Sequence, residues 1–418
     1  MGRLLHIYQT VRAEGVRQPL ALGIFRSDYM DHRGEKFLQV EVNTIASGFG
    51  SLSTIVHQLH LHLVDYFGWE EYREYLCPDN APLKKITEGL QVAVQAFVER
   101  EKKSLAAAKI EGEPVIVFVV EANERNAFDQ FWLQMELWEK WRLRVVRLTM
   151  REIEETTHLS VVGQHLCLED GRPIALCYFR VGYDPSQYSS PQGHEWNARL
   201  KMERSSAIKC PDVSMHLCTA KSIQQKLTEP GVLESLVDWP ATAAEKQATI
   251  DGLRSTFARQ YALPNGAGAA EAMAHARQDP HAYVLKPQRE GGGHLYADEQ
   301  MVKVLEEATP RELSAHVLME RIEPRPLQTW LMRGGVVQEG YVAWELGLFA
   351  TLLVDMTHRD AVPLHSQFAG HLVRTKLSAQ EDGGVAAGVA VLDSPALVPQ
   401  GIVLSPPLVS TPTNTSEK

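Results

Sequence analysis

The sequence predicts a mixed α/β protein, and three kinds of stretch support that prediction. Val115–Val120 and Ile174–Phe179 are continuous apolar runs, which are typical of strands buried on both faces of a parallel sheet. Phe37–Asn43 alternates apolar and polar residues, which indicates a strand with one buried face. Apolar residues from Phe128 to Trp138 recur at helical spacing, so a helix is expected there. The segment that holds both apolar runs therefore predicts an open α/β unit.

Composition fits an ordinary soluble globular protein of two or three domains. The chain has 418 residues, of which 44% are hydrophobic and 22% are charged. Its formal net charge of −10 argues against nucleic acid and anionic membranes as partners, since those surfaces require clustered Lys and Arg. Any anionic ligand is therefore expected to be held by local basic residues.

The cysteines and the first residues predict a cytoplasmic protein. The 5 cysteines form no CxxC pair and cannot all be bridged, so neither a zinc ribbon nor a disulfide scaffold is indicated. That pattern fits a reducing compartment. The sequence contains no run of about 18 apolar residues, and its first residues lack the apolar core of a secretory signal.

The N-terminal part predicts a helix followed by two strands. Leu4–Val16 reads as an amphipathic helix, and the apolar run Leu20–Phe25 continues into the polar cluster Arg26–Met30. On the alternating strand that follows, Glu41 and Asn43 point to the same face and could present two oxygen ligands to one cation. A solvated strand face is the alternative.

A glycine-spaced turn at Ala46–Gly50 leads into a helix-like stretch that contains three histidines. His57 and His60 could share a helical face, with His62 one further half-turn along. No third metal ligand is apparent, so these are expected to be core or exposed histidines.

The α/β unit offers two candidate binding loops. Glu124–Asn126 and Arg180–Tyr183 follow the carboxyl ends of the two apolar strands, where ligands bind in open α/β sheets. Ordinary strand-to-helix turns are the alternative. The helix after the first loop carries an apolar stripe that we expect to face the core. Its members are Phe128, Phe131, Trp132, Met135 and Trp138.

A glycine-rich loop, Lys286–Tyr296, follows the short apolar strand Ala282–Leu285. Three consecutive glycines leave backbone N–H groups open to a polyanion such as a nucleotide phosphate chain. Lys286 and Arg289 could neutralise phosphate, and Glu290 is an oxygen ligand of the kind that Mg²⁺ accepts. A flexible hinge is the alternative.

A second glycine-rich loop, Asp382–Gly388, follows Arg374 and Lys376. Together with Lys221 in a helical stretch, the two loops suggest a phosphate-handling cleft with a lid. The sequence has no Gly-x-x-x-x-Gly-Lys-Ser/Thr loop, no protein-kinase motif set and no Gly-x-Ser-x-Gly elbow. The chemistry left is phosphoryl transfer by positioning and charge neutralisation.

Eight ordered blocks resemble the motifs of eukaryotic-type glutathione synthetase. They are Arg26–Met30, Glu41–Ile45, Glu124–Gln130, Lys209–Asp212, Lys286–Gly293, Glu345–Gly347, His371–Lys376 and Asp382–Asp393. The resemblance implies an ATP-grasp fold with an inserted open α/β substrate-binding domain, in a homodimer. It also implies that γ-glutamylcysteine is joined to glycine, with ATP as co-substrate and Mg²⁺ as cofactor.

The same resemblance implies roles for individual residues. Mg²⁺ would be bound by Glu41, Asn43 and Glu290. The catalytic residues would be Arg26, Arg374, Gly292 and Gly293. The dipeptide and glycine would contact Arg26, Ile45, Ala46, Ser47, Gly48, Glu124, Arg125, Asn126, Gln130, Arg180, Val181, Gly182, Tyr183, Arg374, Val385 and Ala386. ATP would contact Glu41, Lys221, Lys286, Pro287, Gln288, Arg289, Glu290, Gly291, Gly292, Gly293, His294, Tyr296, Met319, Glu320, Arg321, Ile322, Glu345, Lys376 and Asp382.

The domain organisation expected from this resemblance has four parts. Residues 1–112 would form the N-terminal part of the ligase body, 113–218 the inserted domain, 219–395 the ATP-grasp domain with its lid loops, and 396–418 a disordered tail. The segment that usually precedes the first helix is absent, and Gly48, Val181 and the single His294 depart from the family pattern. Two alternatives stay open: a divergent homologue that binds ATP or peptide without turnover, and a ligase with another amine acceptor.

Overall fold

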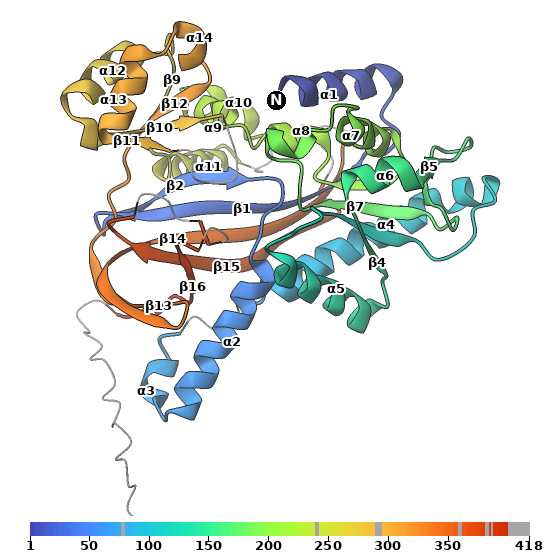
Figure 1. Ribbon diagram of the computed structural model, residues 1–418, viewed down its shortest axis with the longest axis horizontal. Helices are drawn as coiled ribbons and strands as arrows, with labels where there is room; N and C mark the ends of the chain where they lie inside the picture. Colours follow the sequence, from blue (N-terminus) through green and yellow to red (C-terminus); the bar gives the residue numbers. More distant parts are fainter. Residues whose placement is uncertain are drawn as a thin grey trace, which may run out of the picture.

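The protein is described by a computed structural model for residues 1–76, 80–238, 242–288, 295–357, 362–380, 384–385 and 388–399 (Figure 1). A large sheet at the centre and a smaller sheet at one end, each covered by helices, confirm the predicted mixed α/β class. Within these ranges, no helix has both the length and the apolar character needed to cross a membrane.

The larger sheet joins an antiparallel half to a parallel half. Among the described residues it has 10 strands in the order β16-β15-β14-β1-β8-β7-β3-β4, with β2 paired to β1 and β13 paired to β14. The antiparallel strands are β1 (Leu20–His32), β2 (Lys36–Asn43), β13 (Leu327–Arg333), β14 (Val336–Asp355), β15 (His365–Leu377) and β16 (Val391–Asp393). The parallel strands are β3 (Val115–Val119), β4 (Val145–Leu148), β7 (Ile174–Phe179) and β8 (Ile208–Cys210).

Helices cover both faces of the parallel half, which explains its uninterrupted apolar strands. One face packs on α4 (Pro82–Ala107) and α5 (Ala127–Trp141), and the other packs on α6 (Met150–Thr156) and α7 (His194–Arg204) (Figure 1). Every residue of β3 and β7 is buried as a result. Alternate side chains of β3 enter the two separate cores.

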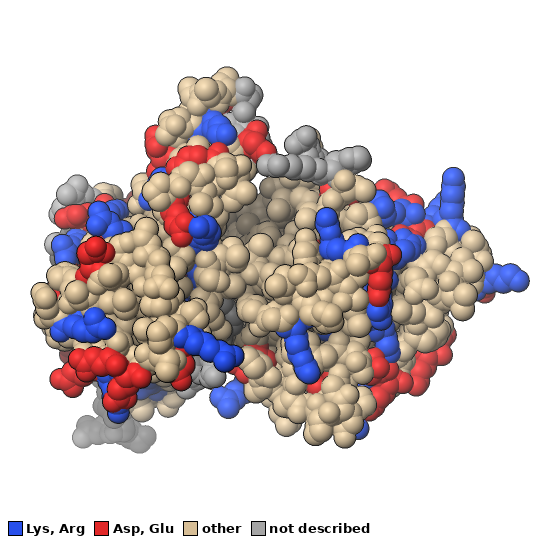
Figure 2. Space-filling model, turned by 90° about the horizontal axis from the view of Figure 1, so that it is seen from above, with Lys and Arg blue, Asp and Glu red and all other residues tan. Residues whose placement is uncertain are grey.

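The smaller sheet has the order β11-β10-β12-β9 and forms a separate lobe with its helices (Figure 1). Its strands are β9 (Gln260–Ala262), β10 (Tyr283–Pro287), β11 (Tyr296–Ala297) and β12 (His316–Glu320). Its helices are α12 (Ala269–Gln278), α13 (Asp298–Glu307), α14 (Pro310–Leu313) and the 3₁₀ turn η2 (Pro280–Ala282). Seen from above, the surface is hollowed between this lobe and the half of the molecule that holds the parallel strands (Figure 2).

The remaining elements connect these parts. Helices α9 (Lys221–Thr228), α10 (Val232–Leu236) and α11 (Ala243–Ser255) lie between the two sheets (Figure 1). Helix α1 (Gly2–Glu14) packs on α7 and α8 (Val213–Leu217), while α2 (Gly50–Tyr66) and α3 (Glu70–Arg73) project away from the large sheet (Figure 1). The last elements are the two-stranded sheet of β5 (Thr157–Leu159) and β6 (Leu166–Leu168), and the 3₁₀ turn η1 (Pro185–Tyr188).

The expectation that the aromatic stripe of α5 faces the core is wrong. The side chains of Phe128, Phe131, Trp132, Met135 and Trp138 are exposed, by 75% in the case of Phe128. The buried face of α5 carries Asp129, Gln130, Leu133 and Leu137 instead. The polar pair can be buried there because both side chains have hydrogen-bond partners.

Candidate active site

Four adjacent antiparallel strands place charged side chains on one face of the large sheet. The strands lie in the order β2, β1, β14 and β15, and alternate residues of each point to the same side. The register sets opposite one another Arg26 and Asn43, Asp28 and Glu41, Asp28 and Gly347, and Glu345 and Arg374. Five of the predicted site residues therefore meet around Asp28, although their positions span most of the sequence.

A carboxylate links the two predicted catalytic arginines. Arg26 donates from Nε to Asp28 Oδ1 at 2.7 Å and from Nη2 to Asp28 Oδ2 at 2.8 Å. Arg374 Nη2 donates to the same Oδ2 at 3.1 Å and also contacts Glu345. Burial opposes the charge of Arg374, but the neighbouring Glu345 and Asp28 raise its pKa above the ordinary value. Both guanidinium groups are thus held in place by the same carboxylate.

The predicted cation-binding pair lies beside this network. Glu41 Oε2 accepts a hydrogen bond from Lys221 Nζ at 3.0 Å, and Lys286 Nζ donates to the carbonyl of Val40 at 2.8 Å. Although burial opposes the charged form, the fields of Lys221 and Lys286 lower the pKa of Glu41, so this carboxylate stays ionised. Asn43 Nδ2 donates to Asp28 Oδ2 at 2.9 Å, which leaves the amide oxygen as its cation-binding group.

These donors fit Mg²⁺ shared with a nucleotide. Mg²⁺ binds through one or two carboxylates together with phosphate oxygens and water, and an ionised Glu41 beside an amide oxygen supplies such a set. The third predicted ligand, Glu290, lies outside the described residues. Within the described ranges, no group of three or more His, Cys, Asp and Glu side chains could hold a metal by itself.

The turn after β2 is held from both halves of the sheet. Ala46 and Phe49 have φ values of 52° and 70°, so this turn visits the left-handed region twice. Arg26 Nη1 donates to the carbonyl of Gly48 at 3.2 Å, and Arg180 Nη1 donates to the carbonyl of Ser47 at 2.9 Å. The predicted dipeptide loop is therefore fixed by one arginine from each half.

Gly48 leaves room for two predicted binding side chains. A Cβ at this position would lie 3.0 Å from Arg180 Nη2 and 3.1 Å from Asn126 Nδ2. Both of these atoms belong to residues predicted to grip the dipeptide. The glycine at position 48 thus coincides with a close approach of the arginine and the asparagine of the two predicted binding loops.

Asp129 holds the turn that leads into α2, a role that the sequence did not reveal. It is 1% exposed, and its carboxylate accepts hydrogen bonds from the backbone N–H groups of Phe49, Ser51 and Leu52 at 2.9, 2.9 and 3.2 Å. These groups belong to the first turn of α2 and the residue before it, so Asp129 supplies the cap from a different helix. Its Oδ2 also lies 3.5 Å from Arg180 Nη2. Burial opposes the charge of Arg180, but Tyr178 and Asp129 raise its pKa.

The loop after β3 is ordered by its own side chains. Glu124 Oε1 accepts from the backbone N–H of Asn126, and Glu124 Oε2 accepts from Gln130 Nε2, both at 2.8 Å. Gln130 Oε1 in turn accepts from Arg147 Nη2 at 2.7 Å. The structure therefore brings together three of the residues predicted in this loop region, whereas Arg125 is exposed.

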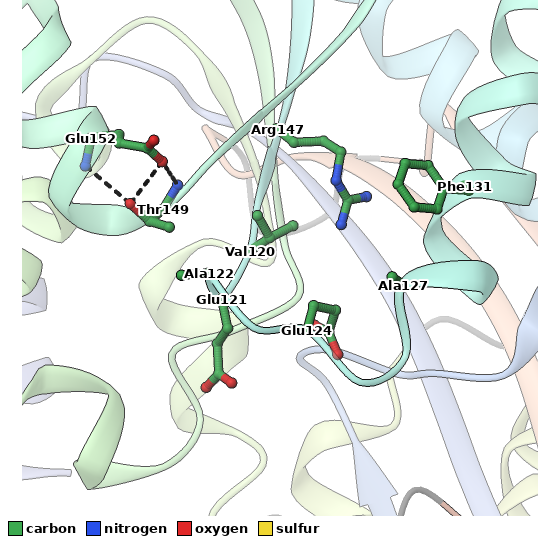
Figure 3. A pocket seen from close by; sticks show the side chains of 9 residues that line it. All are labelled: Val120, Glu121, Ala122, Glu124, Ala127, Phe131, Arg147, Thr149 and Glu152. Carbon is green, nitrogen blue, oxygen red and sulfur yellow. Dashed lines mark hydrogen bonds between the residues drawn. The ribbon is translucent and has the colours of Figure 1, made fainter.

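Arg147 and Glu124 extend into one pocket of ≈ 430 Å³ (Figure 3). It opens at the carboxyl ends of β3 and β4, where the open α/β pattern predicted a binding crevice. Its lining residues are Val120, Glu121, Ala122, Glu124, Ala127, Phe131, Arg147, Thr149 and Glu152. Glu152 faces back to Thr149 in a capping box and is therefore engaged in holding α6 (Figure 3).

The loop after β7 offers the candidate site backbone groups more than side chains. Val181 is 3% exposed and packs in the same core as Ile45, so neither side chain is open to a ligand. Gln187 Oε1 accepts from the N–H groups of Gly182 and Tyr183 at 2.7 and 3.1 Å. This bond pattern fixes the turn that carries Arg180.

The nucleotide-side predictions lie on the small sheet and on β15. Lys286 reaches from β10 to β2, and Gln288 Oε1 accepts from the N–H of Ser222 at 3.1 Å. Met319 is buried, while Glu320 and Arg321 bond to Tyr261 and Asp298 at 3.3 and 2.7 Å. The other described members are Pro287, Tyr296, Ile322 and Lys376, each partly buried. Val385, which was predicted to contact glycine, is also partly buried. The predicted residues outside the described ranges are Arg289, Glu290, Gly291, Gly292, Gly293, His294, Asp382 and Ala386.

Comparison with known proteins places the chain in a family. Residues 1–397 match the family described as "Eukaryotic glutathione synthase, ATP binding domain". Over 407 residues the chain is 39% identical to "Glutathione synthetase, chloroplastic" of Solanum lycopersicum, covering 95% of this chain and 68% of that protein. Over 405 residues it is 36% identical to the glutathione synthetase of Homo sapiens, covering 94% and 78%.

A solved structure shares the fold. A glutathione synthetase-like effector from Globodera pallida superposes with a TM-score of 0.69 at 22% identity, covering 94% of this chain and 80% of that one. The family match extends over all eight blocks of sequence that carry the predicted site. The chain therefore belongs to the eukaryotic glutathione synthase family.

Proposed function

We propose that the chain is a glutathione synthetase, which ligates γ-L-glutamyl-L-cysteine to glycine with ATP and releases ADP and phosphate. The observation that carries the proposal is the position of Arg26. Its guanidinium bonds to the carboxylate of Asp28 and to the carbonyl of Gly48, so it lies between the cation-binding strand and the predicted dipeptide loop. The family match to an ATP-binding glutathione synthase domain supports the same reaction.

The proposed reaction has two steps. First, an oxygen of the cysteinyl carboxylate attacks the γ-phosphorus of ATP, and the bond between this phosphorus and the bridging oxygen breaks. ADP is the leaving group, and the dipeptide becomes an acyl phosphate. Then the glycine amine attacks the acyl carbon, gives up a proton, and inorganic phosphate leaves as the peptide bond forms. Arg26 and Arg374 orient the carboxylate and stabilise the negative charge on its oxygens, for which planar guanidinium groups are well suited.

The ATP side of the proposed site is made by positive side chains and strand edges. Lys221, Lys286 and Lys376 would neutralise the phosphates. Residues 287–296 would cover the phosphate chain, and Met319–Ile322 with Glu345 would border the adenine and ribose. Mg²⁺, held by Glu41, Asn43 and Glu290, would offset the phosphate charge during transfer.

The dipeptide side is made by the loops at the ends of the parallel strands. Ser47 and Gly48 would offer backbone groups to the cysteinyl part. Glu124, Asn126 and Gln130 would hold the γ-glutamyl part, together with Arg180 and Tyr183. Val385 and Ala386 would contact glycine, and their small size favours glycine over larger amines.

We also propose an oligomeric state and a cellular location for the protein. The protein would act as a homodimer, which light scattering of the purified chain at known concentration measures directly. It would act in the cytoplasm, although the tomato relative is named chloroplastic, so fluorescence imaging of the tagged full chain is the suitable measurement.

The test is a four-component assay with the product identified by mass. Phosphate release is expected only when ATP, Mg²⁺, γ-glutamylcysteine and glycine are all present. ATP binding without dipeptide-dependent release would overturn the proposal in favour of a binding protein. A higher rate with β-alanine or serine than with glycine would show another amine acceptor. Glu290→Gln is expected to remove most activity while leaving the fold intact.

A further inference from the structure

Asp28 lies at the centre of the charged face but has no access to solvent. Its side chain is 0% exposed, on the middle strand of the face. With no exposed surface, it cannot contact a ligand directly. Its effect on the reaction must therefore pass through the groups that bond to it.

The hydrogen bonds of Asp28 connect three predicted site residues. Oδ1 accepts from Arg26, and Oδ2 accepts from Arg26, from Asn43 at 2.9 Å and from Arg374 at 3.1 Å. These donors come from β1, β2 and β15, which are not all neighbours in the sheet. One carboxylate thus fixes both proposed catalytic arginines and one proposed Mg²⁺ ligand.

A glycine makes this arrangement possible. Arg374 must reach across β14 to meet Asp28, and the β14 residue opposite Asp28 is Gly347. A Cβ there would lie 2.8 Å from Asp28 Oδ1 and 3.0 Å from Arg26 Cδ. Any larger residue at position 347 would occupy the space in which the two side chains meet.

Charge balance also requires Asp28. Arg26 is 6% exposed, and the side chain of Arg374 is 15% exposed. Two largely buried cations side by side repel each other unless an anion lies between them. Glu345 bonds to Arg374, and among the described carboxylates Asp28 is the one that bonds to both arginines.

We infer that Asp28 is a positioning residue of the ligation reaction, holding Arg26, Arg374 and Asn43 in the arrangement that the acyl transfer requires. The inference rests on the proposed function and deepens it, because it assigns a role to a residue that contacts no substrate. A fixed arrangement of charge before substrates bind is the property that makes such groups effective in catalysis.

A double-mutant cycle with Arg374 tests this role. Asp28→Asn keeps the side-chain shape but removes the charge, so kcat is expected to fall about 100-fold, the scale of a misplaced catalytic group. In a chain that already carries Arg374→Met, Asp28→Asn is expected to lower kcat by clearly less than 100-fold, because one of the three groups that Asp28 positions has already been removed. Equal losses on both backgrounds would mean a general structural effect and would overturn the inference.

The matched control is the surface pair Asp170 and Arg172. It has the same spacing in sequence, with Arg172 Nε donating to Asp170 Oδ2 at 2.8 Å, but Asp170 is 52% exposed at its side chain. Asp170→Asn is expected to leave kcat unchanged. The wild-type rate is measured first, because an inactive wild type contradicts the proposed function. If the wild type is active and the effects of the Asp28 and Arg374 substitutions simply add, only the role of Asp28 is contradicted.

A second variant covers the case in which Asp28→Asn does not fold. Gly347→Ala keeps the charge of Asp28 but displaces the carboxylate, so the same cycle can be run with it. A loss of kcat that shrinks in the Arg374→Met chain supports the inference. A loss of equal size in both chains overturns it.

Discussion

Replacing Gly347 with alanine should damage the reaction more than the fold. The new Cβ would lie 2.8 Å from Asp28 Oδ1, whereas a relaxed contact is about 3.5 Å, so these atoms must separate by roughly 0.7 Å. The hydrogen bond from Arg26 Nε to that oxygen, now 2.7 Å long, would then stretch beyond the usual ~3.2 Å limit. The conformational freedom of glycine is not at issue, because the obstacle is the neighbouring side chains.

The expected loss of activity in Gly347→Ala follows from two separate free-energy costs, one to folding and one to the reaction. Overpacking by one methyl group lowers the free energy of unfolding by about 1–3 kcal/mol, so the protein should still fold. Moving a catalytic group by a large part of an ångström costs on the order of 100-fold in rate, which corresponds to about 2.7 kcal/mol of activation free energy. We therefore expect kcat/KM for the dipeptide to fall by that factor in a folded protein.

The assay is steady-state phosphate release with saturating ATP and glycine, beside denaturant unfolding of the same samples. Gly252→Ala is the control, because a Cβ at that position in α11 meets no heavy atom within 4 Å. That change should leave the rate unaltered and stabilise the helix by up to about 1 kcal/mol. A Gly347→Ala enzyme that keeps kcat/KM within about threefold of wild type would refute the steric reasoning.

Two other predictions concern buried polar groups. Asp129→Ala should lower the free energy of unfolding by about 3 kcal/mol and raise the KM for the dipeptide, because it leaves N–H groups of α2 and the Arg180 cation without their partner; a change below 1 kcal/mol in denaturant titrations would contradict this. Burial lowers the pKa of His165, His216 and His371 below the ordinary 6.5. The unfolded chain therefore binds more protons below about pH 6.5, and stability should decline with falling pH by up to about 1.4 kcal/mol per pH unit for each histidine. Unfolding curves at pH 7.5, 6.5 and 5.5 measure this, and equal stability at all three would exclude it.

The sequence predicted the parallel half of the fold well because its strands bury both faces. The run at Val115–Val120 became β3, and Ile174–Phe179 became β7 with the same bounds. The alternating stretch that ends at Asn43 became β2, one residue longer at its start. By contrast, β14 extends over 20 residues, and the sequence did not predict it as a strand. Its partly exposed hairpin end lacks the alternation that marks a half-buried strand.

Helical periodicity alone could not tell which face of α5 is buried. The aromatic residues repeat as a core stripe would, yet the helix turns Asp129 and Gln130 inward. That choice depends on Arg147 and on three backbone N–H groups in the first turn of α2 and the residue before it, all distant in sequence. A polar residue reads as exposed until its partners are known, so only the tertiary structure reveals this face.

The candidate site could likewise be predicted only in part from local sequence. Glu41 and Asn43 could be paired from strand alternation, since they lie two residues apart. Asp28 and Gly347 were within recognised blocks but had no visible role, because an Arg-x-Asp sequence is equally consistent with a surface ion pair. Their importance depends on the register between β1 and β14, which local sequence does not specify.

The two sides of the proposed site differ in how much must change when substrates bind. On the dipeptide side, Arg26, Arg180 and Asp129 already hold the loop through bonds to its backbone, so little rearrangement is needed there. On the nucleotide side, Lys221 is paired with Glu41, the same carboxylate that is proposed to bind Mg²⁺. When Mg²⁺ and ATP are bound together, Glu41 has the metal and Lys221 has the phosphates as a partner of opposite charge. When only one of the two ligands is bound, either Glu41 or Lys221 faces a like charge or lacks a counter-ion. The binding of Mg²⁺ and the binding of ATP should therefore depend on each other. Removing Mg²⁺ should lower the affinity for ATP by a smaller factor in a Glu41→Gln protein than in the wild type.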